Sequence, residues 1–261
     1  MSVKVARWCA MGGPMMIGLY LIGFICIARF IPPPSPALTG EQLVAMYTER
    51  ALPIRIGLWI ACLAAAFLGP YFAVISTQMR RIEGPHSAPL ASTQVTLGVL
   101  AIFEFILPQM LWQTAAYRAG RSPDSVQTLT DAGWLCYIGI TSTFLVQLSA
   151  IGVAILLDRR ERPLFPRWVG YYSIMTGMMI MPGSLCVFFH EGPFIWSGLF
   201  GWWIPLIAFS GWFPVMTWAL WTAIGAPDER GTALSADPDV RAELDELRAE
   251  LAALRTQPLA G

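Results

Sequence analysis

The distribution of apolar residues divides the chain into six long hydrophobic runs separated by short polar segments. A hydrocarbon core of about 30 Å is crossed by about 20 residues of α-helix, and each run is long enough for one crossing. The runs cover approximately residues 9–31, 52–79, 90–115, 132–157, 168–189 and 195–224. They predict an all-α protein whose residues 1–225 form a bundle of six transmembrane helices, arranged as three antiparallel hairpins.

The composition agrees with this pattern. Of the 261 residues, 56% are hydrophobic and only 13% are charged, which is far more apolar than a soluble domain. The first run is expected to be an uncleaved helix rather than a signal peptide, because it is long and ends in IPPPSP without an A-x-A site. We therefore expect the lipid bilayer to be the main surroundings of the chain.

The basic residues predict how the helices are oriented, because Lys and Arg in short loops are retained on the cytoplasmic side. Eight basic residues flank the runs on one side and five flank them on the other, so both termini are expected in the cytoplasm, with the protein in the cell membrane. No extended basic patch indicates a nucleic-acid partner. The eight are Lys4, Arg7, Arg80, Arg81, Arg159, Arg160, Arg162 and Arg167, and the five are Arg29, Arg50, Arg55, Arg118 and Arg121.

Two segments of the chain resemble each other weakly. AVISTQMRRIEGP, residues 73–85, and AILLDRRERP, residues 154–163, both end a hydrophobic run at an Arg-Arg turn. Upstream of each, a short helical pattern begins at a residue that can cap a helix, Thr39 or Ser122. The hairpins are either true repeats or products of the orientation rule alone, which also favours arginine at these turns.

The residues after 225 change to a polar, acidic composition, which predicts a cytoplasmic tail over residues 226–261. Within it, residues 238–255 are expected to form a helix, opened by Pro238, whose apolar positions follow a heptad spacing. This segment either pairs with a second copy or a partner protein through residues 240–254, or remains a solvated amphipathic helix. The heptad positions are Val240, Leu244, Leu247, Leu251 and Leu254.

The stretch AIFEFILPQMLWQ, residues 101–113, places the carboxylate of Glu104 deep in the third run. A charge near the middle of the bilayer costs at least about 2.5 kcal/mol, so the group is expected to face protein or water and to be paired or neutral. Arg29 and Arg55, near the outer ends of the first two runs, are the expected partners. Both a structural role and a role as a ligand or proton site remain open.

Other polar residues are expected near the same leaflet. Gln109 and Gln113 share one face of the third helix, and Glu104 lies on another, so different neighbours are expected for them. Residues at helix ends such as His190 and Glu191 commonly just meet water. The candidate residues for an outward-facing ligand or proton site are Glu104, Arg29, Arg55, Gln109, Gln113, Gln147, His190 and Glu191.

The last run is rich in aromatic residues. Trp202, Trp203 and Trp212 lie deep within it, where large flat side chains either line a site for an apolar ligand or fill space beside glycines.

Motifs for metal and phosphate chemistry are missing from the sequence. It has two histidines and no H-E-x-x-H, G-x-S-x-G or P-loop pattern, so no metal and no cofactor is expected. The favoured function is a non-catalytic membrane protein that binds or translocates a small apolar or amphipathic molecule, or scaffolds a membrane complex. The alternative is a membrane enzyme acting on a lipid-like substrate, with Glu104, Glu191 and His190 as acid-base groups.

Overall fold

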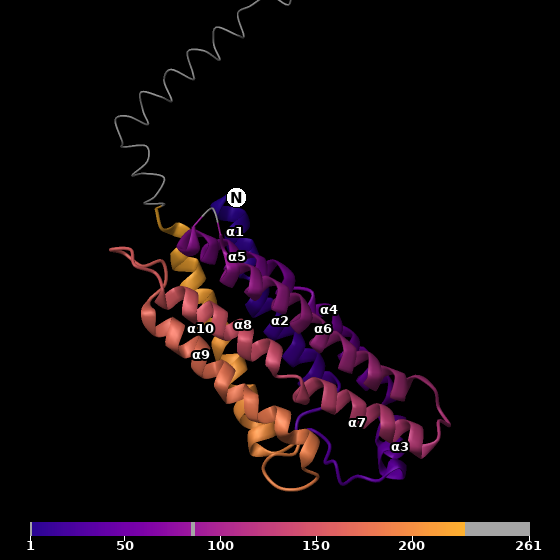
Figure 1. Ribbon diagram of the computed structural model, residues 1–261. Helices are drawn as coiled ribbons and strands as arrows, with labels where there is room; N and C mark the ends of the chain where they lie inside the picture. Colours follow the sequence, from indigo (N-terminus) through magenta and orange to yellow (C-terminus); the bar gives the residue numbers. More distant parts are fainter. Residues whose placement is uncertain (1, 85–86, 228–261) are drawn as a thin grey trace, which may run out of the picture. The chain divides into compact units, whose positions relative to one another are not determined.

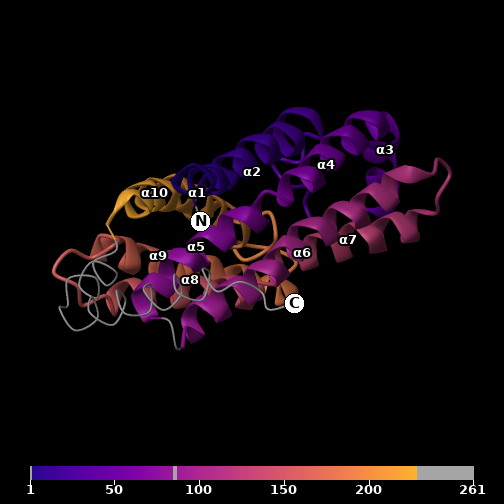
Figure 2. The ribbon, with the colours of Figure 1, turned by 90° about the horizontal axis from the view of Figure 1, so that it is seen from above.

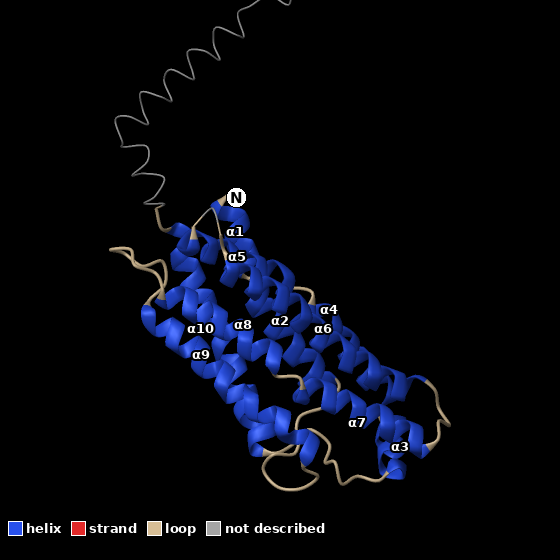
Figure 3. Ribbon diagram, in the orientation of Figure 1, coloured by secondary structure: helices blue, strands red, loops and turns tan. Residues whose placement is uncertain are grey.

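The computed structural model describes residues 2–84 and 87–227, and within these residues all regular structure is helical (Figure 3). In this part of the chain, six helices are long and apolar enough to cross a membrane, which confirms the predicted all-α bundle and its six spans. These are the helices of a multi-pass membrane protein. The tail helix predicted for residues 238–255 lies outside the described residues. The spans are Val3–Ile27, Ala51–Glu83, Pro89–Tyr117, Pro123–Leu156, Arg167–Phe188 and Leu199–Gly225.

Most spans consist of several helical pieces (Figure 1). Only the third is a single α-helix, and α3 is a short helix between the first two spans. The pieces are α1 (Val3–Ala10), α2 (Gly12–Leu21), the π-helical turn η1 (Ile22–Ile27), α3 (Gly40–Glu49), α4 (Ala51–Ala65), α5 (Leu68–Glu83), α6 (Pro89–Tyr117), α7 (Pro123–Gly139), α8 (Ser142–Leu156), α9 (Arg167–Ile180), the 3₁₀ helix η2 (Met181–Phe188), the π-helical turn η3 (Leu199–Trp203) and α10 (Ile204–Gly225).

Helix α6 contacts both the second and the fourth span. It packs against α4 and α5 of the second span and against α7 and α8 of the fourth. Its buried residues include Gln94, Glu104 and Gln109, so these three polar side chains point into protein rather than lipid. Helix α10 contacts α6 through aromatic rings. Phe209 packs on Phe105 of α6, and the ring centroids are 5.7 Å apart.

Glycines allow two pairs of spans to approach closely. The first two spans lie side by side (Figure 2), and Gly23 of η1 faces Gly57 of α4. A Cβ atom on Gly57 would lie 2.6 Å from the Ala28 nitrogen. In the same way, a Cβ on Gly152 of α8 would lie 2.6 Å from the Gly170 carbonyl oxygen of α9. Small residues at such crossings let helix backbones meet, which is how helices associate in lipid.

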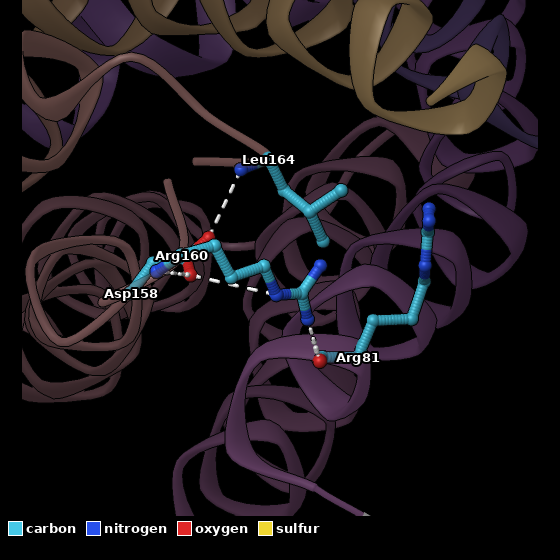
Figure 4. A network of polar contacts seen from close by, with 4 residues as sticks. All are labelled: Arg81, Asp158, Arg160 and Leu164. Carbon is cyan, nitrogen blue, oxygen red and sulfur yellow. Dashed lines mark hydrogen bonds and ion pairs between the residues drawn. The ribbon is translucent and has the colours of Figure 1, made fainter. Parts of the chain in front are cut away.

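A polar network connects the helices at one end of the bundle (Figure 4). This end, here called the basic end, carries Arg80, Arg81, Arg159 and Arg160. Buried Asp158 accepts hydrogen bonds from the backbone N–H groups of Leu164 (2.9 Å) and Arg160 (3.3 Å). The Arg160 guanidinium lies 3.6 Å from Asp158 and donates to the Arg81 carbonyl. Arg81 in turn donates to the Ala223 carbonyl of α10 at 2.9 Å. The two Arg-Arg turns that resemble each other therefore meet, and the network joins the second, fourth and sixth spans.

The opposite end of the bundle, here called the α3 end, contains α3, the start of α4, the end of α6 and the start of α7. Spans two, three and four have 33, 29 and 34 residues, so they are longer than the roughly 20 residues that the hydrocarbon requires. Helix α3 packs on α7, α6 and α4 at this end. We expect this part of the bundle to extend beyond the hydrocarbon.

Capping residues begin the two helices of the α3 end. Thr39 and Gln42 form a reciprocal capping box at the start of α3, and Ser122 accepts from the Ser125 backbone N–H at the start of α7. Both predicted caps are confirmed. Hydrogen bonding to its own backbone N–H and to the Thr39 side chain lowers the pKa of Glu41, which favours negative charge at this helix start. The fourth span begins with α7 at Pro123, whereas it was expected to begin near residue 132.

Candidate functional site

Three spans depart from regular α-helix around one cleft. The fourth span is interrupted at Ile140 and Thr141, between α7 and α8. The fifth changes from α9 into the 3₁₀ helix η2 at Met181, and the sixth changes from η3 into α10 at Ile204. Inside a membrane, irregular backbone is tolerated where it is buried in protein or lines a cavity. Interrupted helices are therefore a physical pointer to a binding site.

The cleft has a volume of about 90 Å³ and a predominantly apolar wall. Ile140 is 38% exposed, so the cleft opens at the surface of the bundle. Gly183 and Gly201 belong to the wall on the side of the fifth and sixth spans. The lining residues are Phe105, Tyr137, Ile138, Ile140, Thr141, Phe144, Ile180, Gly183, Gly201, Trp202, Pro205, Leu206 and Phe209.

One hydrogen-bond donor in this wall has no acceptor among the described residues. The indole nitrogen of Trp202 is buried and bonds to no described protein atom, and the residue as a whole is only 3% exposed. Trp134, whose ring centroid is 5.7 Å from that of Trp202, also has an unpartnered indole N–H. A buried donor without a partner costs about 1–3 kcal/mol. A ligand with an acceptor atom would offset this cost at Trp202.

Glu104 lies beside the cleft and not in its wall. Thr143, in the first turn of α8, donates its hydroxyl to Glu104 Oε1 at 2.5 Å. The other carboxyl oxygen, Oε2, is buried with no hydrogen-bond partner in the described chain. Four residues later, Pro108 has no N–H group, so the Glu104 carbonyl lacks its usual helical hydrogen bond. Phe105 and Phe144, which follow Glu104 and Thr143 in the sequence, both line the cleft. The Glu104–Thr143 pair is therefore adjacent to the wall without being part of it.

The partners proposed for Glu104 from the sequence are wrong. Neither Arg29 nor Arg55 forms an ion pair with it, although all three residues are described. Arg29 is exposed, and the Arg55 guanidinium lies over the Tyr117 ring at 5.6 Å. Long arginine side chains near helix ends reach water or the interface more favourably than the bundle interior.

The glutamines of the third span have separate environments. Gln109 is fully buried and donates to the Tyr20 hydroxyl, whose ring stacks on Phe24 and Tyr137. Gln113 is partly exposed, and its amide nitrogen lies 3.8 Å from the Met110 sulfur.

A second set of buried polar side chains, Gln94 and Gln147, belongs to α6 and α8. Gln147 is 1% exposed and Gln94 is fully buried, and no described protein atom bonds to either amide. A Cβ atom on Gly98 would lie 3.0 Å from the Gln147 amide nitrogen, so this amide lies against the α6 backbone. Gln147 follows Thr143 by one helical turn and continues the polar side of α8.

The expected single pocket lined by all eight candidate residues is not formed. Glu104, Gln109 and Gln147 are buried in the bundle, whereas His190 and Glu191 are exposed after η2. None of the eight lines the cleft. Of the three tryptophans considered, Trp202 lines it, Trp212 donates to Ser173 Oγ at 3.0 Å, and Trp203 is 38% exposed.

Thr143 and the helix interruption before it were not predicted from the sequence. The available signal was the run IGITST, residues 138–143, in which β-branched residues and hydroxyls follow one another. Such residues lose side-chain freedom in a helix or bond to nearby backbone instead.

Comparisons of the chain with protein-family models, with curated proteins and with solved structures found no match. The described residues contain no group of three or more His, Cys, Asp or Glu side chains placed to hold a metal ion.

Proposed function

We propose that this protein is a non-catalytic membrane protein that binds a small apolar molecule carrying a hydrogen-bond acceptor. The site is the cleft at the interrupted fourth, fifth and sixth spans. The observation that supports this most is that Trp202, a residue of the apolar wall, has a buried indole N–H without an acceptor in the described protein. Ligand sites typically combine an apolar wall with few polar groups that fix orientation.

The size of the cleft restricts the ligand. An engineered apolar cavity of about 150 Å³ holds benzene. The cleft, at about 90 Å³, therefore suits a smaller molecule or one end of a longer ligand. Because the cleft opens beside Ile140, the rest of a longer molecule would extend into the surroundings of the bundle. An amphipathic molecule with a carbonyl, ether or hydroxyl oxygen near its apolar end fits both features.

Filling the cleft is expected to abolish ligand binding. Leu206 lines it and Ile207, the next residue of α10, is 71% exposed. We expect Leu206→Trp to lose the bound molecule while Ile207→Trp, the matched control, keeps it. The measurement is native mass spectrometry of each protein extracted with its surrounding lipid, scored for a stoichiometric small molecule.

The proposed hydrogen bond between the ligand and Trp202 is tested separately by removing the indole N–H donor. Trp202→Phe keeps an aromatic ring and removes the N–H, and Trp203→Phe is the control on the more exposed neighbour. We expect about a tenfold loss of affinity for Trp202→Phe alone, which corresponds to one hydrogen bond of about 1.4 kcal/mol. The proposal fails if wild type carries no small molecule, and a protein that copurifies in its place would support a scaffold.

The enzyme alternative needs Glu104, Glu191 and His190 to act on one substrate. Glu104 is buried against Thr143, whereas the other two side chains are exposed in the loop after η2. This arrangement favours binding over acid-base chemistry.

Glu104→Gln distinguishes the two functions. The amide oxygen can still accept from Thr143, so we expect the thermal midpoint to stay within a few degrees of wild type and ligand binding to persist. Glu104→Leu, which removes the acceptor, is the contrasting variant and should lower the midpoint. Loss of ligand turnover or of proton coupling in Glu104→Gln, with binding intact, would support a catalytic or proton-transfer role.

A further inference from the structure

A second pocket lies at the α3 end of the bundle, between α3, the end of α6 and the start of α7. Its volume is about 100 Å³. Arg118 and Arg121 line it, together with the hydroxyl side chains of Tyr47 and Thr48. Small side chains such as Ala115 and Ala119 leave the space open.

The positive charge of this pocket is not matched by the described protein. Arg118 and Arg121 both line the pocket, and no carboxylate is among the lining residues. The Arg118 guanidinium also lies over the Tyr117 ring at 5.9 Å. Neither Arg118 nor Arg121 forms an ion pair with a described side chain, although Asp124 is close in sequence. Arg121 Nε is buried and bonds to no described atom. A buried charged donor without an acceptor is costly, so the pocket favours a ligand with negative charge.

Two residues with hydroxyl side chains, Tyr47 and Thr48, also line the pocket. Burial raises the pKa of the Tyr47 phenol well above its usual range, so the group keeps its proton. Its oxygen lies 3.3 Å from Thr130 Oγ1, which fixes the ring between α3 and α7. Guanidinium forks with nearby hydroxyl donors match the planar or tetrahedral oxygens of a carboxylate or phosphate.

We propose that the pocket between α3 and the α6–α7 turn binds a small oxyanion group, a carboxylate or a phosphate, through Arg118 and Arg121. The group belongs either to a free anion or to a lipid headgroup, because the lengths of spans two, three and four lead us to expect the α3 end beyond the hydrocarbon. This site has no lining residue in common with the apolar cleft, so the inference does not rest on the function proposed above.

The test uses the full chain in an uncharged detergent at constant ionic strength. Inorganic phosphate should raise the thermal midpoint of wild type in a saturable way, as any ligand of the folded state does. Arg118→Gln/Arg121→Gln should weaken the phosphate affinity at least about tenfold. Arg55→Gln removes an exposed arginine at the same end that does not line the pocket, and should behave as wild type.

A second variant separates the pocket from its charge. Ala119→Phe keeps both arginines and blocks the space, and it should also lose the phosphate effect. In a parallel series, phosphatidylglycerol replaces phosphate, and lipids retained per protein are counted by native mass spectrometry. Stabilisation by phosphate alone identifies a free anion, and stabilisation by the lipid alone identifies a headgroup. The inference is overturned if neither ligand stabilises wild type, or if the variants respond as wild type does.

Discussion

Gly57→Leu is expected to prevent the first two spans from packing. Gly57 of α4 faces Gly23 of η1, and a Cβ atom there would lie 2.8 Å from the Ala28 Cβ and closer still to backbone. Backbone cannot move aside as the end of a flexible side chain can. We therefore expect a loss of about 3 kcal/mol or more in the free energy of unfolding, at the upper end of overpacking effects.

The measurement is the yield of monodisperse protein after mild extraction, followed by unfolding in denaturing detergent. Gly18→Leu is the matched control, because Gly18 lies in the same pair of spans with no atom within 4 Å of an added Cβ. Equal behaviour of the two variants would contradict the close approach of η1 and α4.

Asp158→Ala is expected to destabilise the basic end strongly. The buried carboxylate accepts from two backbone N–H groups and lies 3.6 Å from the Arg160 guanidinium. Removing one partner of a buried pair leaves a charge without compensation and typically costs about 3–5 kcal/mol. The expected result is a lower thermal midpoint, with earlier proteolysis in the turn that contains Leu164.

Glu161→Ala is the control, because Glu161 is exposed in the same turn. Its effect should stay within about 0.5 kcal/mol of wild type. If Asp158→Ala unfolds no more easily than this control, the network of Figure 4 contributes little to stability.

The six spans could be predicted because lipid imposes a simple length requirement on every crossing. Helix starts at Thr39 and Ser122 followed from the capping chemistry of their hydroxyls. The first residue of the fourth span could not be predicted, because α7 continues from Pro123 into the apolar run. A polar surface on the first turns of a helix says little about where lipid begins.

The site was only partly predictable. The burial of Glu104 followed from its apolar neighbours, but its partner is a threonine from a helix 39 positions away in sequence. A hydroxyl side chain in an apolar run carries no charge to mark it. The cleft depends on interruptions in three separate spans, and their convergence is a property of packing that no single segment encodes.

The acceptors that join the second, fourth and sixth spans are main-chain atoms. Arg160 donates to the carbonyl of Arg81, and Arg81 donates to the carbonyl of Ala223. A carbonyl is present whatever side chain the residue carries, so mutational drift at position 223 leaves its acceptor in place. In these two bonds, only the donor must be a particular side chain, so substitutions of Arg81 or Arg160 would break them whereas substitutions of Ala223 would not.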